Sequence, residues 1–235
     1  TYHEFSFEIK DELVVIQFHF SFENGPHFHP KTMISAKGFD TELSGEFLKG
    51  YIFNLGLIEA LSFWKAACSP HFRIECGSLT EPQRAWWNQL FIHGLGEFFY
   101  QNKIDFTISD FVLLESSGPF YEPLYRHRRR KALVLASGGK DSVVTTEILE
   151  KQGEPLSLLL VNPTKATLEV TQGKETIVVN RMLDPQLFEL NKKGYLNGHT
   201  PFSAYLAFLS HTVATMYDFD RCVVSNERSA NEGNI

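Results

Sequence analysis

The chain has 235 residues, 43% of them hydrophobic, which is enough for one large domain or for two small domains with separate cores. Its formal net charge of -6 argues against a nucleic acid as the main partner, because a protein that tracks phosphate backbones normally carries clustered positive charge. The sequence has no run of about 18 uncharged apolar residues and no signal-peptide pattern at its start. We therefore expect no membrane span and a cytoplasmic location.

The cysteines fit a reducing compartment. Cys68, Cys76 and Cys222 are odd in number and form no CxxC pair. This favours unlinked thiols over a disulfide scaffold or a zinc ribbon. The chain begins at Thr1 without an initiator Met and stops at Ile235 just after a dense polar cluster, and we expect more protein to follow it.

Residues 1–125 have the pattern of a small α+β domain. Apolar and polar residues alternate from Phe5 to Ile9 and again from Val14 to Phe20, which predicts two strands. Helices are expected at about 47–68 and 82–100. Aromatic residues are dense here, which is typical of a packed core and suits an apolar pocket, so we assign this domain to substrate binding.

A linker separates this region from the rest of the chain. Between Glu115 and Lys131 the sequence passes through Ser-Ser-Gly-Pro and Glu-Pro to a basic run at 126–131. We place the start of a second domain, 126–235, in this linker. The basic run could attract a diphosphate or a nucleotide sugar, although charged linkers are more often only solvated.

From Ala132 onward, predicted strands alternate with predicted helices. The strands are 132–136, 156–161, 176–179 and 221–224. A helix is expected at 143–151, and a longer one is expected to have Thr200 as its cap and Pro201 as its first residue. This order predicts an α/β fold with an open, parallel, doubly wound sheet, preceded by the smaller α+β domain.

A polar loop joins the first buried strand to the following helix. Its residues are Ser137, Gly138, Gly139, Lys140, Asp141 and Ser142. Two successive glycines let backbone amides converge on an anion at a helix N-terminus, where the helix dipole also favours negative charge. The serines add hydroxyl donors, Lys140 a positive charge, and Asp141 a carboxylate for Mg²⁺. The loop therefore predicts a phosphate-binding site.

Further candidates follow from position, because ligands of open α/β sheets bind beyond the carboxyl ends of the strands. The nucleotide is expected to meet Asn162 after the second strand, and Asn226 and Arg228 after the fourth. Proton transfer is assigned to Glu227, Glu232 and His199. An ordinary surface loop remains the alternative for the polar stretch 225–234.

The loop lacks the spacing of a Walker A motif and of a dinucleotide fingerprint. Ser-Gly-Gly-Lys-Asp-Ser resembles instead the pyrophosphate loop of the N-type ATP pyrophosphatase (PP-loop) superfamily, which binds the β and γ phosphates and transfers AMP to a substrate oxygen. Together with 197–203 and 225–234, the loop is similar to the UDP-N-acetyl-α-D-muramoyl-L-alanyl-L-glutamate epimerase (MurL) family. The aromatic-rich N-terminal half is similar to that family too.

The resemblance implies a PP-loop sheet whose loop at 137–142 binds ATP and Mg²⁺, with Lys140 and Asp141 as catalytic residues. It also implies ATP-dependent inversion of the terminal L-Glu of UDP-MurNAc-L-Ala-L-Glu, with release of AMP and pyrophosphate. This chemistry is reasonable, because an acyl-adenylate lacks the carboxylate charge that opposes removal of the neighbouring α-proton. Three alternatives stay open at this point. They are an AMP-forming ligase, a PP-loop enzyme that modifies RNA or a nucleobase, and a non-catalytic ATP-binding module.

Two further groups are disfavoured. His27 and His29 lie one residue apart after a turn, but no carboxylate stands at ligand spacing beside them, which argues against a metal site. A pair of cysteines could transfer protons, but only Cys222 lies near the predicted site, in a strand that we expect to be buried.

Overall fold

The structure, a computed structural model, describes residues 1–40, 42–107, 111–122, 124 and 129–226. Within them the strands are β1 (Tyr2–Lys10), β2 (Leu13–Ser21), β3 (His27–Phe28), β4 (Lys31–Ser35), β5 (His71–Ile74), β6 (Leu113–Ser116), β7 (Arg129–Leu135), β8 (Leu156–Val161), β9 (Thr176–Met182) and β10 (Phe219–Val223). The helices are α1 (Gly45–Ala67), α2 (Glu81–His93), α3 (Gly96–Asn102), α4 (Lys140–Lys151), α5 (Lys165–Val170), α6 (Pro185–Lys192) and α7 (Phe202–Met216).

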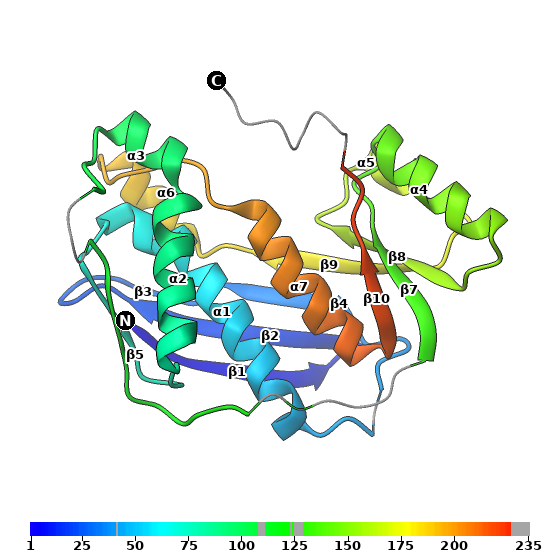
Figure 1. The fold of residues 1–235 in the computed structure, drawn as a ribbon, viewed down its shortest axis with the longest axis horizontal. Coiled ribbons are helices and arrows are strands. Elements are labelled where there is room, and N and C mark those ends of the chain that lie inside the picture. Colours follow the sequence, from blue (N-terminus) through cyan, green and yellow to red (C-terminus); the bar gives the residue numbers. More distant parts are fainter. Residues whose placement is uncertain (41, 108–110, 123, 125–128, 227–235) are drawn as a thin grey trace.

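All of the described strands belong to one twisted sheet (Figure 1). Its order is β10-β7-β8-β9-β4-β2-β1-β5-β6, and β3 pairs with β2. The four strands from β10 to β9 are parallel, which confirms the parallel arrangement predicted for them. Strand β4 then pairs antiparallel with β9, so the strands of both predicted domains share this sheet. The predicted boundary itself, at 125 and 126, lies outside the described residues.

Helices cover both faces of the parallel part. On one face Leu133, Leu159 and Val179 join the main core, to which Leu209 and Val213 of α7 also belong. On the other face Val134, Ala136, Leu158 and Leu160 form a second apolar cluster against Leu149 of α4. Because successive residues of a strand point to opposite faces, a stretch of strand with both faces covered must be apolar on both, as residues 132–135 of β7 and 158–161 of β8 are.

In the antiparallel part, the described elements cover one face only. In β2 the side chains of Val14, Ile16, Phe18 and Phe20 are buried, whereas the residues between them are partly exposed. Helices α1 and α7 lie side by side on the buried face (Figure 1). A Cβ atom on Gly56 of α1 would come within 2.0 Å of the Tyr2 hydroxyl, so this glycine lets β1 approach the helix closely.

Two predicted helix boundaries are wrong. The helix expected at 82–100 is two helices, α2 and α3, because α2 ends at Gly94, whose amide bonds to the carbonyl of Leu90. Helix α7 begins at Phe202 with Pro201 as its N-cap, and no side chain in the described part of the protein caps it, so Thr200 is not the cap. Pro201 has a ψ of 75°, outside the helical range, which moves the start by one residue.

The described cysteines form no disulfide, as predicted. Cys222 is exposed rather than buried, because β10 is the edge strand of the sheet and one of its faces is open. Burial raises the pKa of Cys68 to about 11 and that of Cys76 to about 12, so neither thiol is activated as a nucleophile or base. No helix in the described part of the chain has the length and apolar character needed to cross a membrane.

Candidate functional site

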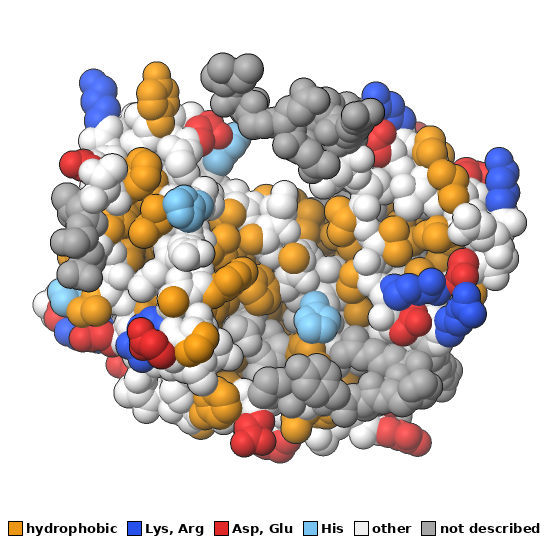
Figure 2. Space-filling view, viewed as in Figure 1, with side chains coloured by type: hydrophobic (Ala, Val, Ile, Leu, Met, Phe, Trp, Pro, Cys, Tyr) orange, Lys and Arg blue, Asp and Glu red, His pale blue; other side chains and the backbone are white. Residues whose placement is uncertain are grey.

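A pocket of about 330 Å³ lies at the edge where β7 and β8 end. The loop after β7 forms one wall with Ser137, Gly139, Asp141 and Ser142. The start of α7 and the residues after β10 complete it, with Phe202, Ser203, Leu206, Ala207, Val224, Ser225 and Asn226. Figure 2 shows hydrophobic side chains across the middle of this face of the molecule. The pocket thus combines polar groups at one end with an apolar wall, as small-molecule sites commonly do.

The backbone of the loop has the geometry that its glycines allow. Gly138 has a φ of +85°, and a Cβ atom there would lie 3.0 Å from Cα of Thr167. Gly139 is the N-cap of α4, and within the described residues no side chain caps this helix. The amides of the first turn therefore remain for water or for a bound anion, at the positive end of the helix dipole.

Neighbouring hydroxyl groups hold the loop in place. Ser142 is buried, and its Oγ donates to the carbonyl of Gly139 at 2.8 Å. Thr167 of α5 donates through Oγ1 to the carbonyl of Ser137 at 2.9 Å. Lys140 is exposed and Asp141 partly exposed. The carboxylate and the serine hydroxyls offer the oxygen ligands that magnesium prefers.

The predicted residues after β10 are only partly described. Ser225 Oγ bonds to Thr145 Oγ1 at 2.8 Å, which fixes the chain against α4, and Asn226 lines the pocket. The other three predicted residues of this stretch, Glu227, Arg228 and Glu232, lie outside the described residues. Their assigned roles stay predictions.

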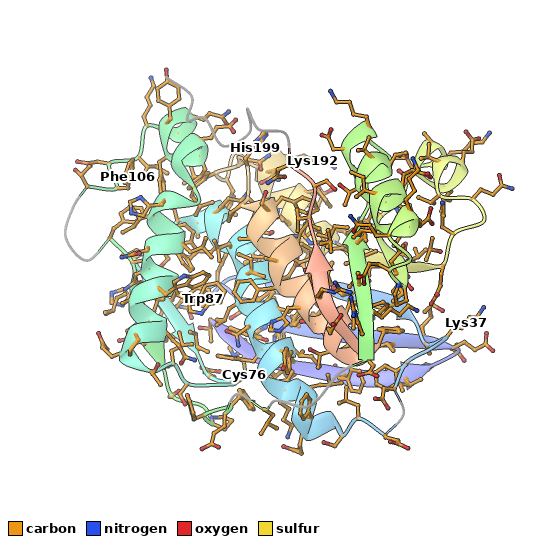
Figure 3. All side chains as sticks on the ribbon, turned by 45° about the vertical axis from the view of Figure 1, so that its right-hand side comes forward. Lys37, Cys76, Trp87, Phe106, Lys192 and His199 are labelled. Atoms are coloured by element: carbon orange, nitrogen blue, oxygen red, sulfur yellow. The ribbon has the colours of Figure 1, made fainter. Side chains whose placement is uncertain are left out.

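Asn162 and His199 are not among the residues that line the pocket. The Asn162 side chain bridges the ends of two strands, because its Nδ2 donates to the carbonyl of Arg181 and its Oδ1 accepts from the Arg181 amide. His199 lies on the loop that leads into α7 (Figure 3). Its Nδ1 is 2.8 Å from Glu97 Oε2, and its side chain is 80% exposed. In this conformation both side chains have structural partners.

A buried ion pair between Arg181 and Glu59, which we did not predict from the sequence, lies near Phe202. Arg181 donates through Nε and Nη2 to the two carboxylate oxygens of Glu59 at 2.8 and 2.9 Å. Its guanidinium also lies 4.3 Å from the ring centre of Tyr205 and 6.0 Å from that of Phe202. In the sequence, the feature that could have indicated this pair is Glu59, a single acidic residue within the apolar run of α1.

Lys65 of α1 is a second buried charge in this region. Its side chain is 5% exposed, and Nζ donates to the carbonyl of Gly198. Burial, with a smaller effect from the positive charge of Arg181, lowers the pKa of Lys65 to about 8. The ammonium group thereby anchors the segment that precedes α7 to the middle of the molecule.

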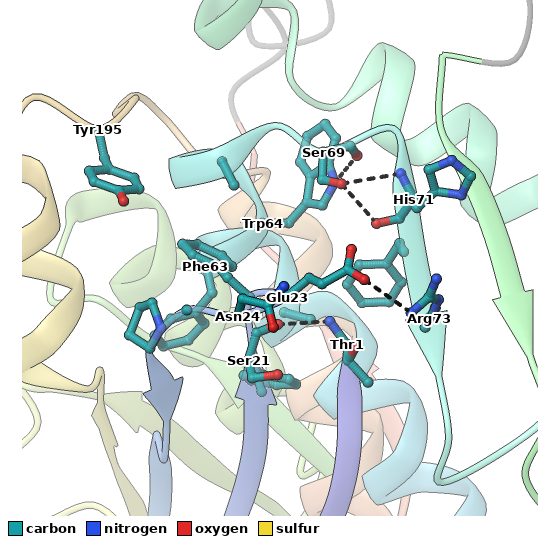
Figure 4. A pocket seen from close by; sticks show the side chains of 17 residues that line it. Thr1, Ser21, Glu23, Asn24, Phe63, Trp64, Ser69, His71, Arg73 and Tyr195 are labelled. Carbon is teal, nitrogen blue, oxygen red and sulfur yellow. Dashed lines mark hydrogen bonds and ion pairs between the residues drawn. The ribbon is translucent and has the colours of Figure 1, made fainter.

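A second pocket, of about 370 Å³, lies at the same edge of the sheet (Figure 4). Strands β2 and β9 both pair antiparallel with β4, so their carboxyl ends lie at one edge. The aromatic residues Phe63 and Trp64 of α1 line this pocket together with Tyr195. Arg73 of β5 adds a guanidinium, 3.9 Å from Glu23 Oε1.

The described part of the basic run is engaged in ion pairs. Arg130 bonds to Glu154 at 2.8 Å, and Arg221 bonds to the same carboxylate at 2.6 Å. Lys131 lies 2.6 Å from Glu175 Oε1. These groups lie near the amino end of β7, opposite the edge that carries the pockets, and Figure 2 shows acidic and basic side chains together there. The remaining residues of the run, 126–128, lie outside the described residues.

Fold and site together define an α/β domain with a pocket at the carboxyl ends of its parallel strands. The chain belongs to the MurL N-terminal domain family, which matches residues 1–235.

Three curated relatives carry the name UDP-N-acetyl-alpha-D-muramoyl-L-alanyl-L-glutamate epimerase. The one from Xanthomonas oryzae pv. oryzae is 34% identical over 188 residues, which cover 76% of the chain and 40% of the relative. Those from Salinispora tropica and a Micromonospora species are 31% and 30% identical over 185 residues each, covering 77% of the chain and 40% and 41% of the relatives. The aligned part of the chain thus spans about 40% of the length of the curated relatives it matches. No solved structure matches the chain.

Proposed function

We propose that this chain is the ATP-binding part of an enzyme that converts the terminal L-Glu of UDP-MurNAc-L-Ala-L-Glu to D-Glu through an acyl-adenylate. The observation that carries the proposal is the pocket at the start of α4, where a glycine turn, two serines and a helix N-terminus that no described side chain caps face one cavity. The names of the three relatives support the substrate.

The pocket suits a nucleotide at both of its ends. The first-turn amides of α4 and Lys140 would bind the β and γ phosphates, and Asp141 would hold Mg²⁺, which neutralises phosphate charge when bound. The apolar wall formed by Phe202, Leu206 and Ala207 of α7 offers a surface for the adenosine.

With ATP bound in this way, cleavage between its α and β phosphates can follow. An oxygen of the substrate's α-carboxylate forms a bond to the α-phosphorus of ATP, while the bond between that phosphorus and the bridging oxygen breaks and pyrophosphate leaves. Amide donors that already hold the leaving diphosphate lower this barrier, by about 3 kcal/mol for one good donor. The product is a mixed anhydride whose carbonyl carries no full negative charge.

Inversion then proceeds at the α-carbon next to the activated carbonyl. Removal of the α-proton sends its electron pair into the carbonyl as an enolate, and a proton returns on the opposite face. Water cleaves the anhydride and yields AMP. Two proton-transfer groups, or one mobile group with water, are needed, and Glu227, Glu232 and His199 stay the candidates for these roles.

The second pocket gives the long substrate a place along the same edge. Residues 195–203 link the two pockets, since Tyr195 lines the second and Phe202 and Ser203 line the first. An aromatic wall beside a guanidinium suits a base and a diphosphate. We place the uridine end of the substrate in the second pocket and its glutamyl end in the first.

The test uses the protein at its natural length with Mg²⁺, ATP and UDP-MurNAc-L-Ala-L-Glu. Pyrophosphate and the chirality of the released glutamate are measured after acid hydrolysis of the product. We expect both AMP formation and D-Glu, and loss of both in Lys140→Ala, with Lys151→Ala at the far end of α4 as the matched control. Pyrophosphate without D-Glu would indicate a ligase, and absence of any nucleotide turnover would indicate a non-catalytic module.

A further inference from the structure

Histidines from three strands gather on the face of the sheet opposite α1 and α7. They are His3 of β1, His19 of β2 and His27 of β3. In β2 the buried neighbours of His19 are Phe18 and Phe20, so the imidazole projects to the open face. His27 likewise precedes the buried Phe28, which pairs with Phe20.

A β-bulge brings His3 to this face. Tyr2 pairs with Phe20 and Glu4 with His19, so one extra residue stands between the two pairs. Tyr2 and Phe5 both pack against the core, and the two residues between them therefore both point to the open face. Bulges re-aim side chains in this way and are often found beside functional sites.

The ring nitrogens of the three residues converge. One ligand nitrogen from each lies within 4.8 Å of the other two. His19 Nε2 and His27 Nδ1 are 2.8 Å apart. Tetrahedral zinc, with bonds to nitrogen of about 2.0–2.1 Å, needs neighbouring ligand nitrogens about 3.3 Å apart, which falls between these two values.

Carboxylates orient two of the rings from behind. Glu75 Oε2 lies 2.6 Å from His3 Nδ1, which leaves His3 Nε2 on the side of Ser21 and His27. Glu4 Oε1 lies 3.6 Å from His19 Nδ1. Metal-binding histidines commonly have such a carboxylate on the nitrogen that does not bind the metal, because it fixes the tautomer and the ring orientation.

We infer that His3, His19 and His27 form a binding site for a divalent transition-metal ion, with zinc as the best fit. Three imidazole nitrogens without a carboxylate ligand select zinc and its neighbours over magnesium or calcium, which prefer oxygen. The fourth position is open for water. Since each ligand comes from a different strand, the ion would join β1, β2 and β3.

The site lies beside the second pocket but on the other face of the sheet. Ser21, which accepts or donates a hydrogen bond at His3 Nε2, also lines that pocket, as do the turn residues Asn24, Gly25 and Pro26 between β2 and β3. Binding of the ion would therefore hold the turn that forms one rim of the pocket. The inference does not depend on the proposed reaction, because it rests on the histidines alone.

Zinc titration of the protein at its natural length, produced without a histidine tag and stripped with a chelator, tests the site. A chromophoric zinc chelator serves as the competitor. We expect one Zn²⁺ per chain in the wild type, and at least tenfold weaker binding in His19→Ala and in His27→Ala. Glu75→Gln should weaken binding by about tenfold, the lower end of what loss of an orienting partner does.

The control is His93→Ala, which removes an exposed histidine of α2 and should bind zinc like the wild type. Thermal unfolding is a second readout, since an ion that binds only the folded state raises Tm. We expect zinc to raise Tm of the wild type and of His93→Ala but not of His19→Ala. No uptake by the wild type, or wild-type affinity in His19→Ala and in His27→Ala, would overturn the inference.

Discussion

Gly138 sets the direction of the loop that enters α4. Its φ of +85° is costly for other residues, and its position leaves no more than 3.0 Å between a new Cβ and Cα of Thr167. We predict that Gly138→Ala weakens ATP binding more than tenfold, because the loop must shift away from the pocket. Isothermal titration with ATP and Mg²⁺ measures the effect.

Gly153, after α4, is the matched control. It also has a positive φ, of +71°, but a Cβ atom there meets nothing within 4 Å. Gly153→Ala should therefore cost about 1–2 kcal/mol of stability through its backbone alone and leave ATP binding unchanged. Equal loss of affinity in both variants would mean that the shape of the Gly138 turn does not matter for the nucleotide.

Lys65 gives a prediction about pH. Its pKa of about 8 in the folded chain lies below the ordinary value of 10.5, so between these values the unfolded chain binds more protons. Stability contributed by this group therefore rises with pH across that window, as the folded state loses a buried charge.

The comparison uses Lys65→Met, which keeps most of the packing but cannot titrate. The free energy of unfolding of the wild type, relative to that of the variant, should increase from pH 7.5 to pH 10 in denaturant titrations. Between the two pKa values the increase per pH unit should approach the slope that the linkage relation gives for one proton. A difference that stays constant over this range would contradict the lowered pKa.

At the scale of elements, the Glu59–Arg181 pair joins α1 to β9. Both side chains are largely buried, with exposed fractions of 1% and 12%. Arg181→Met leaves the Glu59 carboxylate uncompensated, and we predict a loss of about 3–5 kcal/mol in the free energy of unfolding. The exposed pair Glu189–Lys192 on α6 provides the control, since Glu189→Gln should cost less than about 1 kcal/mol. Similar losses in both variants would contradict the role of burial.

Long elements with a local signal could be predicted from the sequence. The alternation in β1 and β2, the apolar run of α1 and the four parallel strands each carry their own pattern. Strands β3 to β6 have two to five residues and were not predicted. These short strands are stabilised by pairing with strands that lie far away in the chain. A local sequence pattern does not indicate such partners.

The candidate site also has a part that could be predicted from the sequence and a part that could not. The loop at 137–142 could be predicted because its glycines, serines and charges are consecutive in the sequence. The wall supplied by α7, the pair of Arg181 with Glu59, and the histidine cluster depend on how distant elements pack. The sequence pointed to His27 and His29, whereas the structure groups His27 with His3 and His19, whose rings contact Glu75 and Glu4.

At the scale of the whole molecule, the sheet brings two pockets to one edge. If the uridine end of the substrate occupies the second pocket, Tyr195→Ala should raise KM for UDP-MurNAc-L-Ala-L-Glu at least fivefold and leave KM for ATP unchanged. Tyr100, which is 86% exposed and lines neither pocket, supplies the control variant Tyr100→Ala. Steady-state kinetics with each substrate varied in turn distinguish the two effects, and a rise in both KM values for Tyr195→Ala would contradict separate pockets.

The transfer of AMP to the substrate is the central claim, and the fate of one oxygen atom tests it most directly. UDP-MurNAc-L-Ala-L-Glu labelled with ¹⁸O in the α-carboxylate of its glutamate is turned over with ATP, and the nucleotide product is analysed by mass spectrometry. If the carboxylate attacks the α-phosphorus and water later cleaves the acyl bond, the product is AMP that carries one ¹⁸O atom. Formation of ADP, or of AMP without the label while D-Glu appears, would contradict the account.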